Sequence, residues 1–79
     1  MITVRFFAGA RAAAGTAEQK VEAATLTDLV ALLTSEHGEP LRRVLTAASF
    51  LVDGTVSHDR TAALPDGAAI DVLPPFAGG

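Results

Sequence analysis

Two adjacent glycines, Gly78 and Gly79, are the residues of this sequence that most clearly indicate a chemical role. Because glycine has no Cβ, such a pair passes through narrow channels and adopts dihedrals that other residues avoid. A free carboxylate on Gly79 would be the most accessible reactive group of the chain. A carboxylate is a poor acceptor for nucleophiles, whereas an acyl-adenylate carries a good leaving group, and no side chain crowds this carbonyl carbon. The pair predicts a terminal carboxylate that is presented for activation. The alternative is a tail without a role, because two consecutive glycines occur at a given position by chance in about one chain in 200.

The other candidate groups for chemistry argue against a self-contained active site. The chain has no cysteine, which excludes disulfides, thiolate metal sites and cysteine nucleophiles. If the protein handles sulfur, the carbonyl of Gly79 is therefore its only covalent carrier. The histidines and the candidate acids have no spacing that indicates acid–base catalysis or a metal site; they are His37, His58, Asp53, Asp59, Asp66 and Asp71.

Length and composition indicate one small domain. The chain has 79 residues, 49% of them apolar, and a net charge of −3. Its only lysine is Lys20 and its arginines form no basic stripe, which argues against nucleic-acid binding. No apolar run reaches the about 18 residues that a membrane span needs, and we find no signal-peptide pattern at the N-terminus. We expect a cytoplasmic protein without membrane contact.

The elements that position the tail begin with a strand over residues 2–8. Alternation places Ile2, Val4, Phe6 and Ala8 on the core face, and therefore turns Thr3, Arg5 and Phe7 away from the core. A short helix over 11–14 follows, with Gly15 at the position where helices commonly end. A weaker alternation over residues 18–22 predicts a charged edge strand.

The central part of the sequence predicts the main helix. Thr25 is placed to cap the backbone N–H of Asp28, and Gly38 ends the helix. Its apolar stripe has helical spacing and consists of Leu26, Leu29, Val30 and Leu33. Pro40 opens a second short helical segment, with Leu41, Val44 and Leu45 on one side.

The last third predicts strands and turns. A strand over 49–52, a turn at Asp53-Gly54 and a partner strand over 55–57 form a hairpin. Residues 64–67 form a second turn, and residues 68–73 form the last strand, with Asp71 and Leu73 turned away from the core. Pro74-Pro75 stops strand pairing because proline has no N–H to donate. We expect a domain over 1–74 and a flexible tail over 75–79.

These features together resemble the ubiquitin-like β-grasp sulfur carriers, most closely the small subunit of molybdopterin synthase in the MoaD/ThiS-type family. The resemblance spans the whole chain. Its most specific parts are residues 4–8 with Arg11 shortly after, and the tail over 73–79. It implies an α+β fold with a mixed sheet of about five strands, one main helix on one face and a protruding tail. It also implies that the first and last strands are parallel neighbours at the sheet centre.

The resemblance further implies a function in molybdenum cofactor biosynthesis. An E1-like adenylyltransferase uses ATP to adenylate Gly79, and a persulfide donor converts the adenylate to a thiocarboxylate. The tail then enters the large synthase subunit and delivers sulfur to the pterin precursor, in a heterotetramer of two small and two large subunits. The chain itself would be non-catalytic and bind no cofactor. Besides the catalytic Gly78 and Gly79, the implied partner-binding residues are Phe7, Arg11, Val56, Leu73, Pro75 and Phe76.

Four other functions stay open. A carrier for thiamine thiazole synthesis is disfavoured by Pro74-Pro75, whereas a carrier for cysteine synthesis fits the Ala77-Gly78-Gly79 ending. A ubiquitin-like modifier would use the same terminus to join target lysines. The remaining alternative is an interaction domain without covalent chemistry. For Phe7 and Leu73, the alternative to partner binding is that a loop or the short helix covers their side chains.

Overall fold

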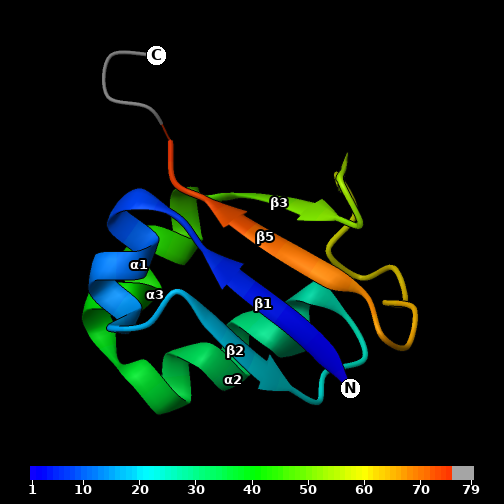
Figure 1. Cartoon of the computed structure of the whole chain (residues 1–79), viewed down its shortest axis with the longest axis horizontal. Coiled ribbons are helices and arrows are strands. Elements are labelled where there is room, and N and C mark those ends of the chain that lie inside the picture. Colours follow the sequence, from blue (N-terminus) through cyan, green and yellow to red (C-terminus); the bar gives the residue numbers. More distant parts are fainter. Residues whose placement is uncertain (76–79) are drawn as a thin grey trace.

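The computed structural model describes residues 1–75 and has the element order that the sequence predicts (Figure 1). The elements are β1 (Ile2–Phe6), α1 (Ala8–Ala14), β2 (Glu18–Val21), α2 (Leu26–His37), α3 (Glu39–Ala47), β3 (Ser49–Val52), β4 (Thr55–Val56) and β5 (Ala69–Leu73).

The strands form one five-stranded mixed sheet in the order β2-β1-β5-β3-β4. β1 and β5 are parallel, with Val4 opposite Ile70, and the other pairs are antiparallel. The expected parallel pairing of the first and last strands is confirmed. Together with the helices, this sheet gives the α+β, ubiquitin-like β-grasp fold.

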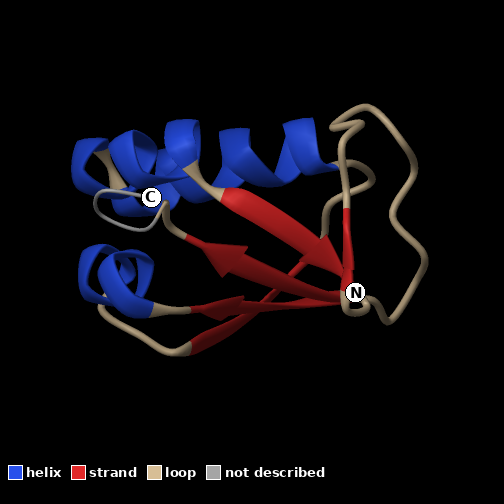
Figure 2. Cartoon of the chain, turned by 90° about the horizontal axis from the view of Figure 1, so that it is seen from above, coloured by secondary structure: helices blue, strands red, loops and turns tan. Residues whose placement is uncertain are grey.

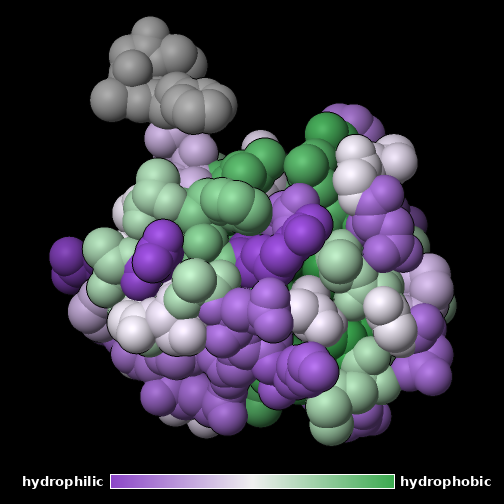
Figure 3. Space-filling view, viewed as in Figure 1, coloured by the Kyte–Doolittle hydropathy of each residue, from purple (hydrophilic) through white to green (hydrophobic). Residues whose placement is uncertain are grey.

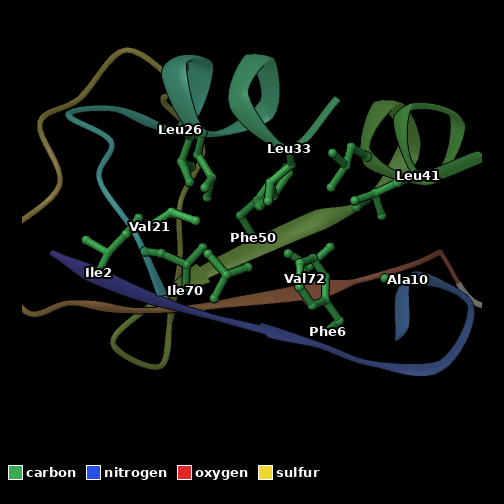
Figure 4. Close-up of a cluster of buried hydrophobic side chains, with 14 of the residues drawn as sticks. Ile2, Phe6, Ala10, Val21, Leu26, Leu33, Leu41, Phe50, Ile70 and Val72 are labelled. Carbon is green, nitrogen blue, oxygen red and sulfur yellow. The ribbon is translucent and has the colours of Figure 1, made fainter. Parts of the chain in front are cut away.

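The helices α2 and α3 cover one face of the sheet, and α1 lies at the end of the sheet where β1 finishes (Figure 2). The core fills the space between the helices and the sheet (Figure 4). The helices contribute Leu26, Leu29, Leu33, Leu41 and Leu45, and the strands contribute Ile2, Val4, Phe6, Val21, Phe50, Ile70 and Val72. Val30, expected in the core stripe, is only half-buried against it.

Helix ends agree with the capping residues. The Thr25 Oγ1 accepts a hydrogen bond from the Asp28 backbone N–H at 3.1 Å, which begins α2 as predicted. Gly38, with φ of 82°, ends it, and Gly15, with φ of 75°, ends α1. Both lie in the left-handed region that glycine enters at low cost.

The start of α1 corrects the sequence analysis. Ala8 was expected on the core face of the first strand, but it is exposed and begins α1 with φ of 49°. The chain leaves the sheet after Phe6, so the alternation ends there and Ala10 takes the buried position instead. The short helix therefore begins earlier than the predicted Arg11. The later strands are also shorter than predicted, since β4 ends at Val56 and β5 begins at Ala69.

Candidate functional site

The sheet end from which the tail departs brings several predicted residues together. Parallel strands finish at the same end of a sheet, so Phe7 follows β1 beside the point where Pro74 follows β5. Figure 1 shows α1 at this end, next to the segment that leaves β5. Pro75 is exposed and is the last described residue. The predicted site residues Phe76, Gly78 and Gly79, and most of the expected tail, lie outside the described residues.

Phe7 has a fixed backbone and an exposed ring. Its N–H donates to the Val72 carbonyl at 3.3 Å, and its own carbonyl accepts from the Ala10 N–H at 3.0 Å. Its side chain is nevertheless 42% exposed. The expected orientation away from the core is confirmed. Leu73, next to it on β5, is half-buried.

The sheet face opposite α2 and α3, here called the open face, carries the remaining candidates. By register and alternation it consists of Thr3, Arg5, Glu18, Lys20, Ser49, Leu51, Val56, Ala69, Asp71 and Leu73. Val56 is 49% exposed on the edge strand β4, opposite Leu51. Two strands separate β4 from β1. Phe7 and Val56 therefore do not form one contact cluster, and Leu51 lies between them.

An ion pair that the sequence analysis missed lies in the middle of the open face. The Arg5 Nε donates to Asp71 Oδ1 at 2.6 Å, and the Arg5 Nη2 donates to Asp71 Oδ2 at 3.1 Å. These hydrogen bonds hold the pKa of Arg5 above its ordinary value. The signal was present, because alternation turned both residues off the core and the first and last strands were expected to be neighbours. What was lacking was the register that sets Arg5 directly opposite Asp71.

Arg11 is exposed on α1 and lies close to this face. It lines an open pocket of about 280 Å³ together with Arg5, Phe7 and Glu18. It has no ion-pair partner among residues 1–75. Four of the predicted partner-binding residues, namely Phe7, Arg11, Leu73 and Pro75, thus gather at the tail end of the molecule, and Val56 lies apart.

Within the described part of the chain, no group of three or more histidine and carboxylate side chains is placed to hold a metal ion. No helix over the same residues is long and apolar enough to span a membrane. What this region does bring together, among residues 1–75, is the exposed ring of Phe7 and the guanidinium of Arg11, which has no ion-pair partner there.

Several solved structures share the fold of this chain. The chain is similar to one chain in the structure of the complex of subunits 1 and 2 of molybdopterin-converting factor from Helicobacter pylori, with 27% identity, a TM-score of 0.75 and coverage of 99% of this chain and 97% of that chain. Small archaeal modifier protein 1 from Methanosarcina acetivorans is 25% identical, with a TM-score of 0.86 and coverage of 99% and 95%. CysO from Mycobacterium tuberculosis shares the fold, with 17% identity, a TM-score of 0.79 and coverage of 96% and 100%.

A search of the curated proteins gave no match. The profile of the ThiS family matches residues 4–79, which is nearly the whole chain and includes the two glycines. The β-grasp sheet, the parallel central strands and this match lead to one conclusion: the chain belongs to the ThiS family.

Proposed function

We propose that this protein is a sulfur carrier that acts as the small subunit of molybdopterin synthase. The observation that carries the proposal is the family match over residues 4–79, which ends on Gly78-Gly79 directly after a β-grasp domain. The similarity to a molybdopterin-converting factor complex supports this pathway. At a coarser level, the family and the solved neighbours support a small sulfur carrier or ubiquitin-like modifier that works with partner proteins.

The proposed chemistry takes place on the Gly79 carboxylate. An E1-like adenylyltransferase forms the acyl-adenylate from ATP and releases pyrophosphate. The terminal sulfur of a persulfide donor then attacks the carbonyl carbon and displaces AMP, which gives an acyl disulfide. A thiol of a partner protein cleaves the S–S bond, forms a disulfide with the donor, and releases the thiocarboxylate. Glycine suits this position because the reacting carbon has no neighbouring side chain to block attack. The chain supplies the carrier group, and its partners supply the catalytic groups.

The proposed partner surface is the tail end of the sheet with the adjoining open face. Phe7 supplies an exposed aromatic ring on a backbone held by hydrogen bonds on both sides. Rigid aromatic side chains of this kind are common anchors of protein interfaces. Leu73 and Pro75 lie next to the departing tail, and Arg11 adds a positive charge. In this proposal the large synthase subunit covers these residues while it receives the tail.

The proposal is tested by the intact mass of the protein after incubation with ATP, an E1-like adenylyltransferase and a persulfide donor. We expect a mass increase equal to replacement of one oxygen by sulfur, located at Gly79 by fragmentation. Gly79→Ala should form far less thiocarboxylate. Gly9→Ala is the matched control, because Gly9 lies in α1 with open space around its Cβ position. Full conversion of Gly79→Ala, or no conversion of the wild type by competent activating enzymes, would refute the proposal.

A second candidate function is protein modification, favoured by the similarity to small archaeal modifier protein 1. Mapping of Gly-Gly isopeptide remnants on cellular lysines, compared between wild-type and Gly79-deleted chains, separates the two functions. Remnants that depend on the chain would favour the modifier. A carrier for cysteine synthesis would be a sulfur carrier like the one proposed. The two are distinguished by the acceptor that takes the sulfur from the loaded protein.

A further inference from the structure

The parallel pair of β1 and β5 ends at Phe7 and Pro74, and its hydrogen bonds show why it ends there. The Thr3 N–H donates to the Ala68 carbonyl at 3.0 Å. Four residues further along both strands, the Phe7 N–H donates to the Val72 carbonyl at 3.3 Å. In a parallel ladder with this register, the next bond runs back from the N–H of residue 74 to the Phe7 carbonyl. Residue 74 is proline, which has no N–H, so this bond cannot form.

The Phe7 carbonyl is used by α1 instead. It accepts from the Ala10 N–H at 3.0 Å and from the Arg11 N–H at 3.4 Å, and N–H groups at the start of a helix need such an acceptor. A carbonyl oxygen has two lone pairs, so a donor at residue 74 would have to displace one of these bonds. The bend into α1 also carries backbone strain, because Ala8 adopts a φ of 49°. The missing donor at residue 74 therefore leaves both acceptor positions of Phe7 to the helix.

Pro75 has different surroundings. Main-chain groups along β5 point alternately to its two neighbours, so Val72 bonds to β1 and Leu73 lies opposite Ser49 of β3. Residue 74 thus points to β1 and residue 75 points to the β3 side. The position opposite residue 75 in that register is 47, which lies in α3, so β3 offers no strand acceptor there. Both prolines stiffen the chain, but only Pro74 removes a donor that has an acceptor opposite it.

From this geometry we infer that Pro74 is a positioning residue for activation of the tail, because it keeps the chain after β5 off the Phe7 carbonyl. The inference rests on the proposed function, in which an E1-like adenylyltransferase must receive Gly79. Figure 1 shows that the chain turns away from the line of β5 here, and Figure 3 shows hydrophobic surface at this end of the sheet, where Phe7 is exposed. With an N–H at residue 74, a fraction of the molecules would lengthen β5, and only the remaining fraction would present the whole segment after Leu73.

The experiment compares Pro74→Ala with Pro75→Ala in the full chain. Each variant loses one proline ring, and only the first gains a donor that points to Phe7. Amide hydrogen exchange is measured by NMR. We expect the new N–H of residue 74 to exchange about 3- to 10-fold more slowly than the new N–H of residue 75, as the net stability of one backbone hydrogen bond implies. The Ala10 N–H should exchange faster in Pro74→Ala than in the wild type, because it shares its acceptor.

The effect on activation is measured by pyrophosphate release from the E1-like adenylyltransferase at varied concentrations of the carrier. We expect Pro74→Ala to raise KM by about 3- to 10-fold and to leave kcat unchanged, because molecules with residue 74 bonded to Phe7 do not bind productively. Pro75→Ala should raise KM clearly less. The thermal midpoint of each variant is the control for folding.

A synthetic chain with the change Pro74→N-methylalanine separates the missing N–H from the ring, since it lacks both. It should have the KM of the wild type. Equal exchange rates of the two new N–H groups, equal KM values of the two alanine variants, or an N-methylalanine chain that behaves like Pro74→Ala would each overturn the inference. If competent adenylyltransferases do not act on the wild type, the proposed function fails. Hydrogen exchange then still decides whether Pro74 keeps residue 74 off the Phe7 carbonyl.

Discussion

Phe7 keeps its ring in solvent while its backbone is held by Val72 and Ala10. We expect Phe7→Ala to weaken binding to the large synthase subunit by about 10-fold or more, because an aromatic anchor is lost without disturbing the core. Calorimetry measures the dissociation constant, and the thermal midpoint serves as the control for folding. Unchanged affinity would remove Phe7 from the proposed partner surface.

Asp59 organises the loop between β4 and β5. Its Oδ1 accepts from the Thr61 hydroxyl at 2.6 Å and from the Thr61 N–H at 2.9 Å, and these bonds lower the pKa of Asp59. A carboxyl with a lowered folded pKa adds stability above its unfolded pKa of about 4, and this is lost as pH falls through the folded value.

We therefore expect Thr61→Val to raise the pKa of Asp59 towards its ordinary value, because the hydroxyl donor is removed. A carboxyl NMR titration measures the pKa of Asp59 in the wild type and in the variant. A pKa of Asp59 that does not change would show that the hydroxyl is not the main cause of the shift.

Single residues also mark where prediction from the sequence succeeds and fails. Alternation correctly predicted that Phe7 is exposed and that Asp71 points away from the core, because strand periodicity is a local property. It failed at Ala8, since nothing in the strand pattern states where the chain turns into α1. The Arg5–Asp71 pair was missed because its register joins residues that are far apart in the sequence.

At the scale of elements, the Thr25 cap begins α2. We expect Thr25→Ala to lower the free energy of unfolding by about 1 kcal/mol, because the N–H of Asp28 loses its acceptor. Urea denaturation provides the measurement. Ser35→Ala, at an exposed position of the same helix, is the control and should change stability little. Equal effects of the two changes would contradict the capping role.

The order of elements was predicted correctly because capping residues, turn residues and periodicity are all local signals. Thr25, Gly38 and Asp53-Gly54 each mark an end or a turn that the structure confirms. Element ends were less accurate where hydrogen bonds of the adjoining turns decide them. β5, for example, begins at Ala69 because the N–H of Ala68 bonds within the preceding turn, to Pro65.

The whole molecule depends on one small core between the helices and the sheet. Leu33 is fully buried there, while its neighbour Leu32 is only half-buried. We expect Leu33→Ala to cost about 2–5 kcal/mol of unfolding free energy, as deletion of a buried leucine side chain does. Leu32→Ala should cost clearly less, and both are measured by urea denaturation. Similar losses at the two positions would contradict the packing described here.

The strand order could not be derived from the residues alone. Hydrophobic patterns give strands and faces, but they do not say which strands are neighbours. The parallel pairing of β1 with β5 was predicted only through the family resemblance. The candidate site depends on that pairing, because it brings Phe7 and Pro74 to one end of the sheet.

The position of β5 between β1 and β3 has a consequence during protein synthesis. A nascent chain that has reached only residue 68 lacks the strand that joins the two halves of the sheet. Until residues 69–73 are made, no strand can join the pair β1–β2 to the pair β3–β4, and such non-local closure is intrinsically slow. The segment that completes the fold is followed within a few residues by the two glycines. Under the proposed function, a chain that carries the two glycines has therefore already made the strand that completes its sheet.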